Sequence, residues 1–575
     1  MEAKKPFGRS LSDFFPLRAG EQKLLEACRE GREAVLSNGL PMPLPLIETK
    51  QELGPWPLFW PIPDKKPERV SLTVENCVRA DFVRFLLLGG DDQSPVHERG
   101  VMLNGAFIGG ELSLRSCNIP ASLMLRNCFF SGELNAQDAT ISGVLGLPGS
   151  HLAAGLKADR LKCEGSVFLR AGFTAKGVVR LHGAKIDGNL ECSDGLFDSR
   201  KDNALIADGA NFTGNVILGE GFTANGVVRL LSVEIGGDLD CVGGRFAKIS
   251  DIALSFNGAV VHGSCFVSEL PKSVGIDASH ADVGVLIDDS TTWAKGSSLS
   301  GFRYRTFGGK APINGKERIA WLLKQPPEHL NEADFRPQPW RHLHWVLREM
   351  GHTEDAKQVG IAFEDHLRKI DRMGKWPNDP GDLVCGFKGI VTRTAHYMFG
   401  KLAGYGYRPV DLVMWMLGVW LACAGVYWYF ASPPYAAIAP SEPLVFQDAR
   451  YSECRPQAKE SVSIEKQKGQ DEQPDKKRMI GNWPLCSDMP GEYSTFSPLA
   501  YSLDLLLPVV DLGQEKYWGA YIPSPNESAA NESILNWRWG YFVRFVTWFE
   551  TLFGWVSSLL LVAIISGFSR RNDEG

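Results

Sequence analysis

The sequence predicts a mixed fold in which a right-handed parallel β-helix of about eight coils, each of about 22 residues, precedes two transmembrane helices. Three observations support this prediction. Short apolar segments recur about every eleven residues from 106 to 292. Helical patterns flank this repeat region and predict helical caps and a helical hairpin. Two segments near the C-terminus are long and apolar enough to cross a bilayer.

The repeat is clearest in two related stretches, Gly172-Phe-Thr-Ala-Lys-Gly-Val-Val-Arg-Leu181 and Gly221-Phe-Thr-Ala-Asn-Gly-Val-Val-Arg-Leu230. A shorter pattern, Leu-x-Gly-Ala-x-Ile-x-Gly-x-Leu, runs from Leu103 to Leu112 and again from Leu181 to Leu190. Apolar residues alternate inside each unit, as they do in β-strands. A β-sandwich is the alternative, but sandwiches do not keep a fixed short period over such a length.

Details of the repeat lead to three further expectations. The recurrent glycines are expected at corners that need a positive φ or close backbone packing. Two longer steps, 195–210 and 244–259, predict loop insertions. Cys192 and Cys241 occupy the same place in their units, and we expect them to be small buried apolar residues.

Solenoids need caps at their ends. We predict an N-terminal segment, 1–99, in which a helix over Glu75–Leu88 covers the first coil of the repeat domain, 100–292. A second helix is expected over Leu24–Val35. The proline-rich stretch 41–67 is expected to be extended.

Residues 293–409 predict a helical, basic juxtamembrane domain. Within it, a helix over Gly315–Lys324 precedes a hairpin of two helices, one that begins at Trp340 and one that begins at Thr353. Two interpretations of the hairpin stay open: a cap that links the β-helix to the membrane, or a surface for a partner. The segment 387–402 is basic and amphipathic, which suits an anionic membrane surface.

The predicted transmembrane helices are 410–430 and 545–568, with a tail at 569–575. Each approaches the roughly 20 apolar residues that span a bilayer. Two buried core helices are the alternative. Arg393, Lys401 and Arg408 precede the first segment, which predicts that its N-terminal side lies in the cytoplasm. If both segments span the membrane, the C-terminus is also cytoplasmic and 431–544 lies outside the cytoplasm.

The segment 431–544 holds two kinds of candidate residue. Cys454 and Cys486 would face an oxidising compartment, where a disulfide between them could form. The apolar stretch 497–512 is too short to span and would lie in the interface or re-enter the membrane. Asp504 and Asp511 lie within it and are candidate pore residues.

Signatures of enzymatic chemistry are missing. The sequence contains no dinucleotide fingerprint, nucleophile elbow or paired zinc cysteines, so we nominate no catalytic, cofactor-binding or metal-binding residue and expect no cofactor. Four histidines cluster in the hairpin, and we expect surface or interface roles for them: His342, His344, His352 and His366. The net charge of −6 gives no reason to expect a nucleic-acid partner.

Several segments together resemble a known bacterial family: the repeats, the Trp340–Leu367 hairpin, Gly404-Tyr-Gly-Tyr-Arg-Pro409, and Tyr501-Ser-Leu-Asp-Leu-Leu-Leu-Pro-Val-Val-Asp-Leu-Gly513. Its members join pentapeptide-like repeats to a two-span membrane segment and are often labelled "membrane-associated oxidoreductase". The resemblance covers most of residues 20–570. It implies a multi-pass protein of the bacterial inner membrane, and it carries no catalytic residue over to this chain.

Three functions follow from these observations. The first is a non-enzymatic inner-membrane protein whose cytoplasmic β-helix is a binding or assembly platform, tethered to the lipid bilayer by two spans. Its partner would be another protein or a second copy of the chain. The second is an oligomeric pore or membrane effector that uses 497–512. The third is a membrane-associated oxidoreductase, as the family resemblance implies.

Overall fold

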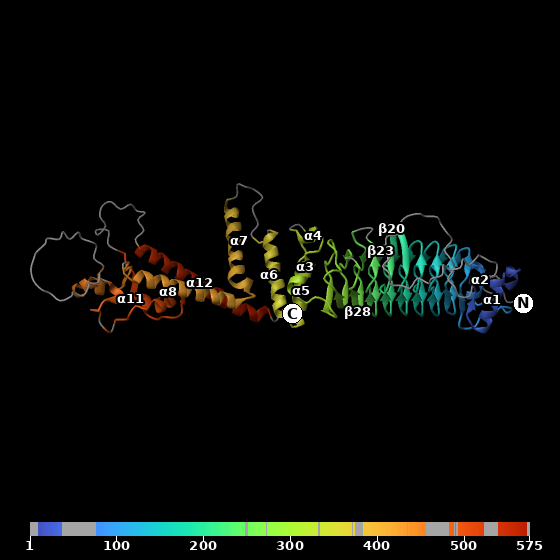
Figure 1. Ribbon diagram of the computed structural model, residues 1–575, viewed down its shortest axis with the longest axis horizontal. Coiled ribbons are helices and arrows are strands. Elements are labelled where there is room, and N and C mark those ends of the chain that lie inside the picture. Colours follow the sequence, from blue (N-terminus) through green and yellow to red (C-terminus); the bar gives the residue numbers. More distant parts are fainter. Residues whose placement is uncertain are drawn as a thin grey trace, which may run out of the picture. The chain divides into compact units, whose positions relative to one another are not determined.

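A computed structural model describes residues 10–36, 76–247, 251–271, 273–331, 334–370, 372–373, 383–433, 435–455, 482–487, 489, 491, 493–522 and 539–571. The chain divides into two compact units, Met1–His366 and Leu367–Gly575, which we describe separately. The predicted 293–409 segment is therefore divided between them. Figure 1 labels some of the elements named below.

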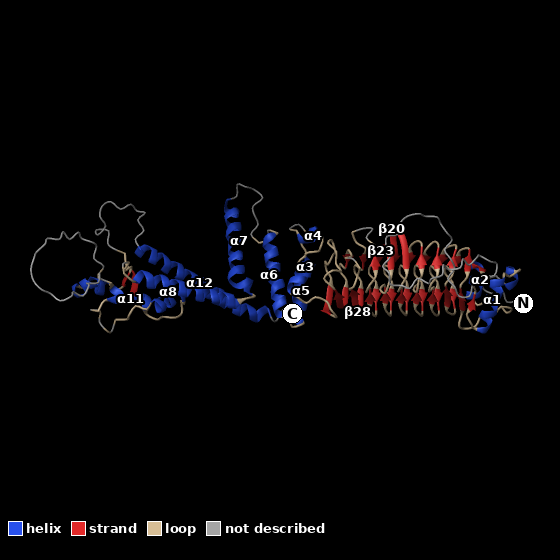
Figure 2. Ribbon diagram, viewed as in Figure 1, coloured by secondary structure: helices blue, strands red, loops and turns tan. Residues whose placement is uncertain are grey.

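The first unit contains a parallel β-solenoid of about nine turns, so the predicted β-helix is confirmed. Strand β3 (Val101–Asn104) pairs in parallel with β7 (Leu123–Arg126), and β7 pairs with β11 (Leu145–Gly146). Val101 lies beside Leu123 and Leu123 beside Leu145, which gives 22 residues per coil. Figure 2 shows the strands as rows that run along the solenoid.

Columns of apolar side chains fill the inside of the solenoid. One column takes one residue from each coil: Leu103, Leu125, Leu147, Leu169, Cys192, Leu218 and Cys241, all fully buried. Burial raises the pKa of the Cys192 thiol, which is therefore neutral. The prediction that Cys192 and Cys241 are buried apolar residues is confirmed.

The two glycines of the repeat pattern have different roles. The first, Gly183, lies at a corner with a φ of 63°. The second, Gly188, lies against the preceding coil, where an added Cβ would be 2.8 Å from the backbone nitrogen of Ser166. Glycine is not obligatory at the corners, because other residues there also have a positive φ: Ser116, Asn127, Asp138 and Arg160.

The first of the two longer steps differs from the expected loop. Two coils contain 26 residues, since Leu190 pairs with Val216 and Leu239 with Cys265. The first insertion extends strand β20 (Leu196–Ile206), which pairs with β23 (Thr223–Arg229) through two register shifts. Its extra residues are therefore taken up as bulges in a sheet. Part of the second insertion lies outside the described residues.

Two helices cover the N-terminal end of the solenoid. They are α1 (Ala19–Glu30) and α2 (Ala80–Leu87). The helix predicted over Glu75–Leu88 begins only at Ala80, because the residues before it form β2 (Cys77–Arg79), which pairs with β4 (Phe107–Gly109). The predicted extended stretch 41–67 lies outside the described residues.

A buried ion pair holds this N-terminal cap. The carboxylate of Glu21 is fully buried and accepts hydrogen bonds from the backbone and guanidinium nitrogens of Arg79. Burial alone would raise the pKa of Glu21, but these hydrogen bonds keep it below its usual value. The pair joins α1 to β2 of the solenoid.

His151 extends a stack of rings on one face of the solenoid. Its ring centroid lies 5.2 Å from that of Phe129, which lies 5.5 Å from that of Phe107. Burial, with a smaller effect of Lys176, lowers the pKa of His151 from 6.5 to about 4. Between these values the unfolded chain binds more protons than the folded chain, so stability should fall as the pH decreases.

This loss of stability gives a testable prediction. As the pH decreases from 6.5 to 4, the effect of His151 should lower the free energy of unfolding by on the order of 3 kcal/mol at most. His151→Phe should keep the ring stack and reduce the dependence of the free energy of unfolding on pH in this range. His182→Gln, a substitution of an exposed histidine, should leave this dependence unchanged. Denaturant unfolding across the pH range measures the slope. Identical slopes in wild type and His151→Phe would contradict the prediction.

Helices also cover the C-terminal end of the solenoid. Helix α5 (Gln338–Glu349) lies against the last strand, β31 (Arg303–Phe307), and its side chains bind backbone groups there. Gln338 accepts a hydrogen bond from Gly301 N and donates one to Phe302 O, and His342 Nε2 lies 3.0 Å from Tyr304 N. The edge of the sheet is thereby covered, which blocks pairing with another strand.

A second buried ion pair joins this end of the solenoid to helix α3 (Gly315–Leu322). Arg318 on α3 donates two hydrogen bonds, of 2.9 and 2.8 Å, to the carboxylate of Asp288 at the end of β30 (Asp282–Asp288). Trp293 Nε1 donates a third, of 2.9 Å. The Arg318 guanidinium also lies 3.7 Å from the ring centroid of Phe307.

The second unit contains the two apolar helices, α8 (Pro409–Ala431) and α12 (Trp539–Arg571). Both are long and apolar enough to cross a membrane. Helix α7 (Leu383–Ala403) precedes α8, and the turn between them holds Tyr405 with a φ of 55°.

Candidate functional site

Helices α8 and α12 lie side by side and antiparallel (Figure 1). Leu412 near the start of α8 shares an apolar cluster with Ile564 near the end of α12. Further along, Tyr427 of α8 contacts Glu550 of α12. The start of α8 and the end of α12 therefore lie at the same end of the pair.

Between these two helices lies a buried carboxyl group, that of Glu550, with no exposed surface. Tyr427 Oη donates a hydrogen bond of 2.7 Å to Glu550 Oε2. Ser502 Oγ is hydrogen-bonded to Glu550 Oε1, and the thiol of Cys423 is a further partner. Tyr427 and Ser502 are also fully buried, so water does not reach the cluster.

Helix α10 (Pro498–Leu506) brings Ser502 to this cluster. It contacts both α8 and α12. An added Cβ at Gly554 would lie 2.0 Å from the backbone oxygen of Leu506, so this glycine gives α10 room to approach. Glu550 and Gly554 are four residues apart on α12, as Ser502 and Leu506 are on α10, so both contacts lie along one face of each helix.

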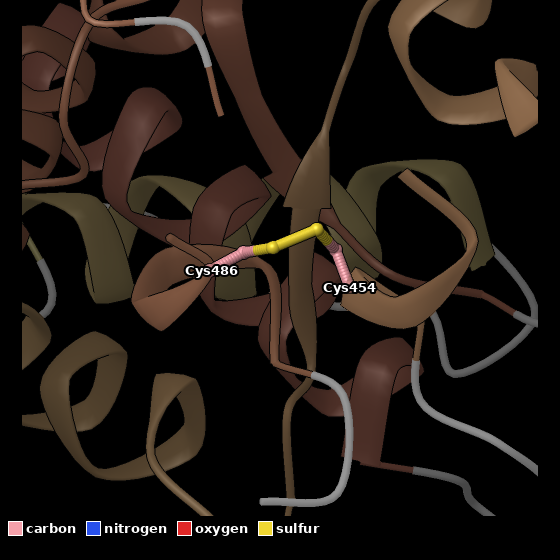
Figure 3. The surroundings of a disulfide bond; sticks show 2 residues. All are labelled: Cys454 and Cys486. Atoms are coloured by element: carbon pink, nitrogen blue, oxygen red, sulfur yellow. A yellow bond between two sulfur atoms is a disulfide. The ribbon is translucent and has the colours of Figure 1, made fainter. Parts of the chain in front are cut away.

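A folded segment covers the end of α8 that lies nearest Tyr427. Strand β32 (Ile438–Pro440) pairs with β33 (Trp518–Ala520), and Asn482 Nδ2 donates a hydrogen bond of 2.9 Å to Ala431 O. Cys454 and Cys486 form a disulfide with a Cα–Cα distance of 5.5 Å (Figure 3). This bond joins the two ends of the stretch 454–486, of which 456–481 lie outside the described residues.

The candidate pore residues differ in their surroundings. Asp504 is buried on α10 and accepts hydrogen bonds from the backbone nitrogens of Leu512 and Glu515, at 2.7 and 2.9 Å. Asp511 is exposed and pairs with Lys516, which lowers the pKa of its carboxyl. The structure therefore gives Asp504 a structural role in the turn after α10. The carboxylates of Asp504 and Asp511 have different hydrogen-bond partners in the structure.

This difference predicts unequal effects of two matched substitutions. Asp504→Asn should destabilise the turn after α10 by about 1–3 kcal/mol, because an amide has a single acceptor oxygen and the buried carboxylate now accepts from two backbone N–H groups. Asp511→Asn should change the stability of the turn little, since an exposed ion pair contributes little. Peptide-resolved hydrogen exchange over 507–517 measures both. Loss of ion flux from liposomes in Asp511→Asn would instead favour the pore interpretation.

Sequence reasoning missed Glu550. The residue stands in the run Thr547-Trp-Phe-Glu-Thr-Leu-Phe553, where an acidic side chain is surrounded by apolar and aromatic residues. Such a residue in a membrane helix is costly and therefore marks a functional candidate. That signal was present in the sequence, but its partners Tyr427 and Ser502 lie 123 and 48 positions away.

The hairpin histidines lie within the fold of the first unit. Besides His342, His344 Nδ1 lies 2.8 Å from Ala356 O and His366 Nε2 lies 2.9 Å from Leu330 O. Within the described residues, no group of three or more histidine, cysteine or acidic side chains is arranged to hold a metal ion.

Comparisons with known proteins add no relative. Searches against family models, curated proteins and solved structures found no match to this chain.

Proposed function

We propose that this chain is a non-enzymatic protein of the bacterial inner membrane, in which the β-helix is a binding or assembly platform. Helices α8 and α12 are the tether that spans the bilayer. The observation that carries the proposal is the combination, in one chain, of a regular solenoid and two helices long and apolar enough to cross a membrane.

The capped ends of the solenoid support a platform of finite length. Helices α1 and α2 cover one end, and α5 covers the backbone edge of β31 at the other. Edge-to-edge growth of the sheet is therefore disfavoured, and the sides of the solenoid are left for a partner. These sides carry ion pairs between successive coils, such as Arg160 with Asp138 and Arg180 with Asp159. Such a surface suits a protein partner or a second copy of the chain.

Two observations support cytoplasmic termini and a periplasmic 431–544 segment. Arg393, Lys401 and Arg408 precede α8, as expected on the cytoplasmic side of a span. The Cys454–Cys486 disulfide would form and persist in the oxidising periplasm. Because α8 and α12 are antiparallel, an N-terminal side in the cytoplasm also returns the C-terminus there.

The platform is favoured over the two other functions. For a pore, Asp504 would have to face an ion path, but its carboxylate is engaged by the backbone of the following turn. For the oxidoreductase that the family resemblance implies, solenoid cysteines would be the obvious redox groups. Burial raises the pKa of Cys128 and Cys265 to about 12, so neither thiol is a reactive thiolate at neutral pH.

Native mass spectrometry of the detergent-purified full-length protein tests this proposal. We expect the mass of the chain, 63.4 kDa, or a whole-number multiple of it without a bound cofactor. A mass excess that matches a flavin, nicotinamide, haem or metal would overturn the non-enzymatic function. A cofactor-free closed ring that conducts ions in liposomes would favour the pore. Extraction of the protein from membranes by alkaline carbonate would overturn the spanning tether.

A further inference from the structure

The hydroxyl of Ser502 has two neighbours that both need a proton. Its Oγ lies 2.9 Å from the backbone oxygen of Trp420, and it is also hydrogen-bonded to Glu550 Oε1. A backbone carbonyl only accepts hydrogen bonds, and so does an ionised carboxylate. Serine has a single hydroxyl proton and cannot donate it along both contacts at once. One more proton is needed between Ser502 and Glu550.

Protonation of Glu550 satisfies every oxygen in the cluster. Glu550 Oε1–H then donates to Ser502 Oγ, and Ser502 Oγ–H donates to Trp420 O. On the other side, Tyr427 Oη–H donates to Glu550 Oε2. The Cys423 thiol donates to the carboxyl group as well. In this arrangement each contact has one donor and one acceptor, and the chain of hydrogen bonds ties α12 to α10 and α10 to α8.

The charges around Glu550 also favour the neutral acid. In the part of the chain that the structure describes, the titratable groups near Glu550 are Cys423 and Tyr427 on α8 and Tyr501 on α10. Asp504 and Glu515, the latter on α11 (Gln514–Tyr517), lie near Tyr501. All five are acids, so none offers a positive charge to an ionised Glu550. A buried carboxylate without a cation partner is strongly disfavoured, and such a group takes up a proton instead.

We propose that Glu550 is a proton-binding site of the second unit, and that release of its proton loosens helix α10 from α8. When Glu550 is ionised, the Ser502 hydroxyl turns to the carboxylate and its hydrogen bond to Trp420 O is lost. The ligand is a proton, and the responding element is α10. This inference rests on the packing of α8, α10 and α12, so it does not depend on the platform function.

Infrared spectroscopy of the full-length protein in liposomes tests the protonation. In mildly acidic buffer we expect the carbonyl stretch of a protonated carboxylic acid, shifted in D2O, and its replacement by a carboxylate band in alkaline buffer. The band should be lost in Glu550→Gln and retained in Asp411→Asn, which changes an exposed acid of α8. Identical spectra of wild type and Glu550→Gln in acidic buffer would overturn the proposal. So would a band that appears only when sodium is removed, which would indicate a cation site.

Hydrogen exchange of α10 tests the response. Glu550→Gln can donate to Ser502 as the protonated acid does, so protection factors over 498–506 should stay high in both buffers. Wild type should lose protection in alkaline buffer, and Glu550→Ala should have low protection in both. Because Glu550→Gln keeps the packing and Glu550→Ala does not, the pair separates a proton effect from a folding defect. Unchanged wild-type protection across the pH range would overturn the release of α10.

Discussion

Replacing Arg318 by methionine is expected to lower the free energy of unfolding of the first unit by about 3–5 kcal/mol. Methionine keeps much of the length of the side chain, so the loss comes mainly from charge and hydrogen bonds. Arg318 and Asp288 are 2% and 1% exposed, and the substitution leaves the Asp288 carboxylate buried without its cation. The substitution also removes the hydrogen bond from Arg318 to Pro312 O and the contact of its guanidinium with the ring of Phe307.

Two further variants identify the cause of this loss. Arg336→Met removes an arginine that pairs with Asp334 at the surface, and it should leave stability unchanged. Adding Asp288→Asn to Arg318→Met removes the unpaired charge while it keeps an acceptor for Trp293 Nε1, so part of the loss should be recovered. Denaturant unfolding of the detergent-solubilised chain, with hydrogen exchange over 288–322, measures all three. Equal stabilities of Arg318→Met and Arg336→Met would contradict the prediction.

The sequence predicts the solenoid well because each coil repeats the same burial pattern. A side chain such as Leu125 lies directly over Leu103 in the previous coil, so the period of the sequence is the period of the structure. The two apolar helices are equally local signals, since length and composition suffice to find them. The helical hairpin is predicted for the same reason, because its apolar residues follow the helical period.

The groups that join elements are harder to predict, because their partners are distant in sequence. Arg318 and Asp288 are 30 residues apart, and Glu21 and Arg79 are 58 apart. No period links such residues, and each looks like an ordinary surface charge until the fold is known. The same holds for Ser502, an ordinary helix residue that becomes notable only beside Glu550. The insertion at 195–210 forms a bulged strand instead of the predicted loop for a related reason: composition alone does not distinguish the two.

Removing the disulfide is the second change with a large expected effect. Cys454 and Cys486 are 32 residues apart, and a cross-link across a stretch of this length stabilises the folded state by about 3–4 kcal/mol through the entropy of the unfolded chain. Cys454→Ser should therefore loosen the segment that packs on the end of α8, where Cys454 and Trp483 are both buried. Hydrogen exchange over 438–455 and 482–487 should increase. Cys77→Ser, at a half-buried free thiol of the first unit, should leave these segments unchanged.

The same bond tests the orientation of the chain in the membrane. If 431–544 faces the periplasm, Cys454 and Cys486 should resist alkylation in cells until a reductant is added, and their tryptic peptides should be cross-linked in the unreduced protein. Both cysteines should become alkylated when the periplasmic oxidation system is disabled. A cytoplasmic 431–544 segment would leave both thiols free, because reducing agents there keep cysteines unpaired. Free thiols at both positions in oxidising cells would therefore reverse the proposed topology and place the solenoid on the opposite side of the membrane.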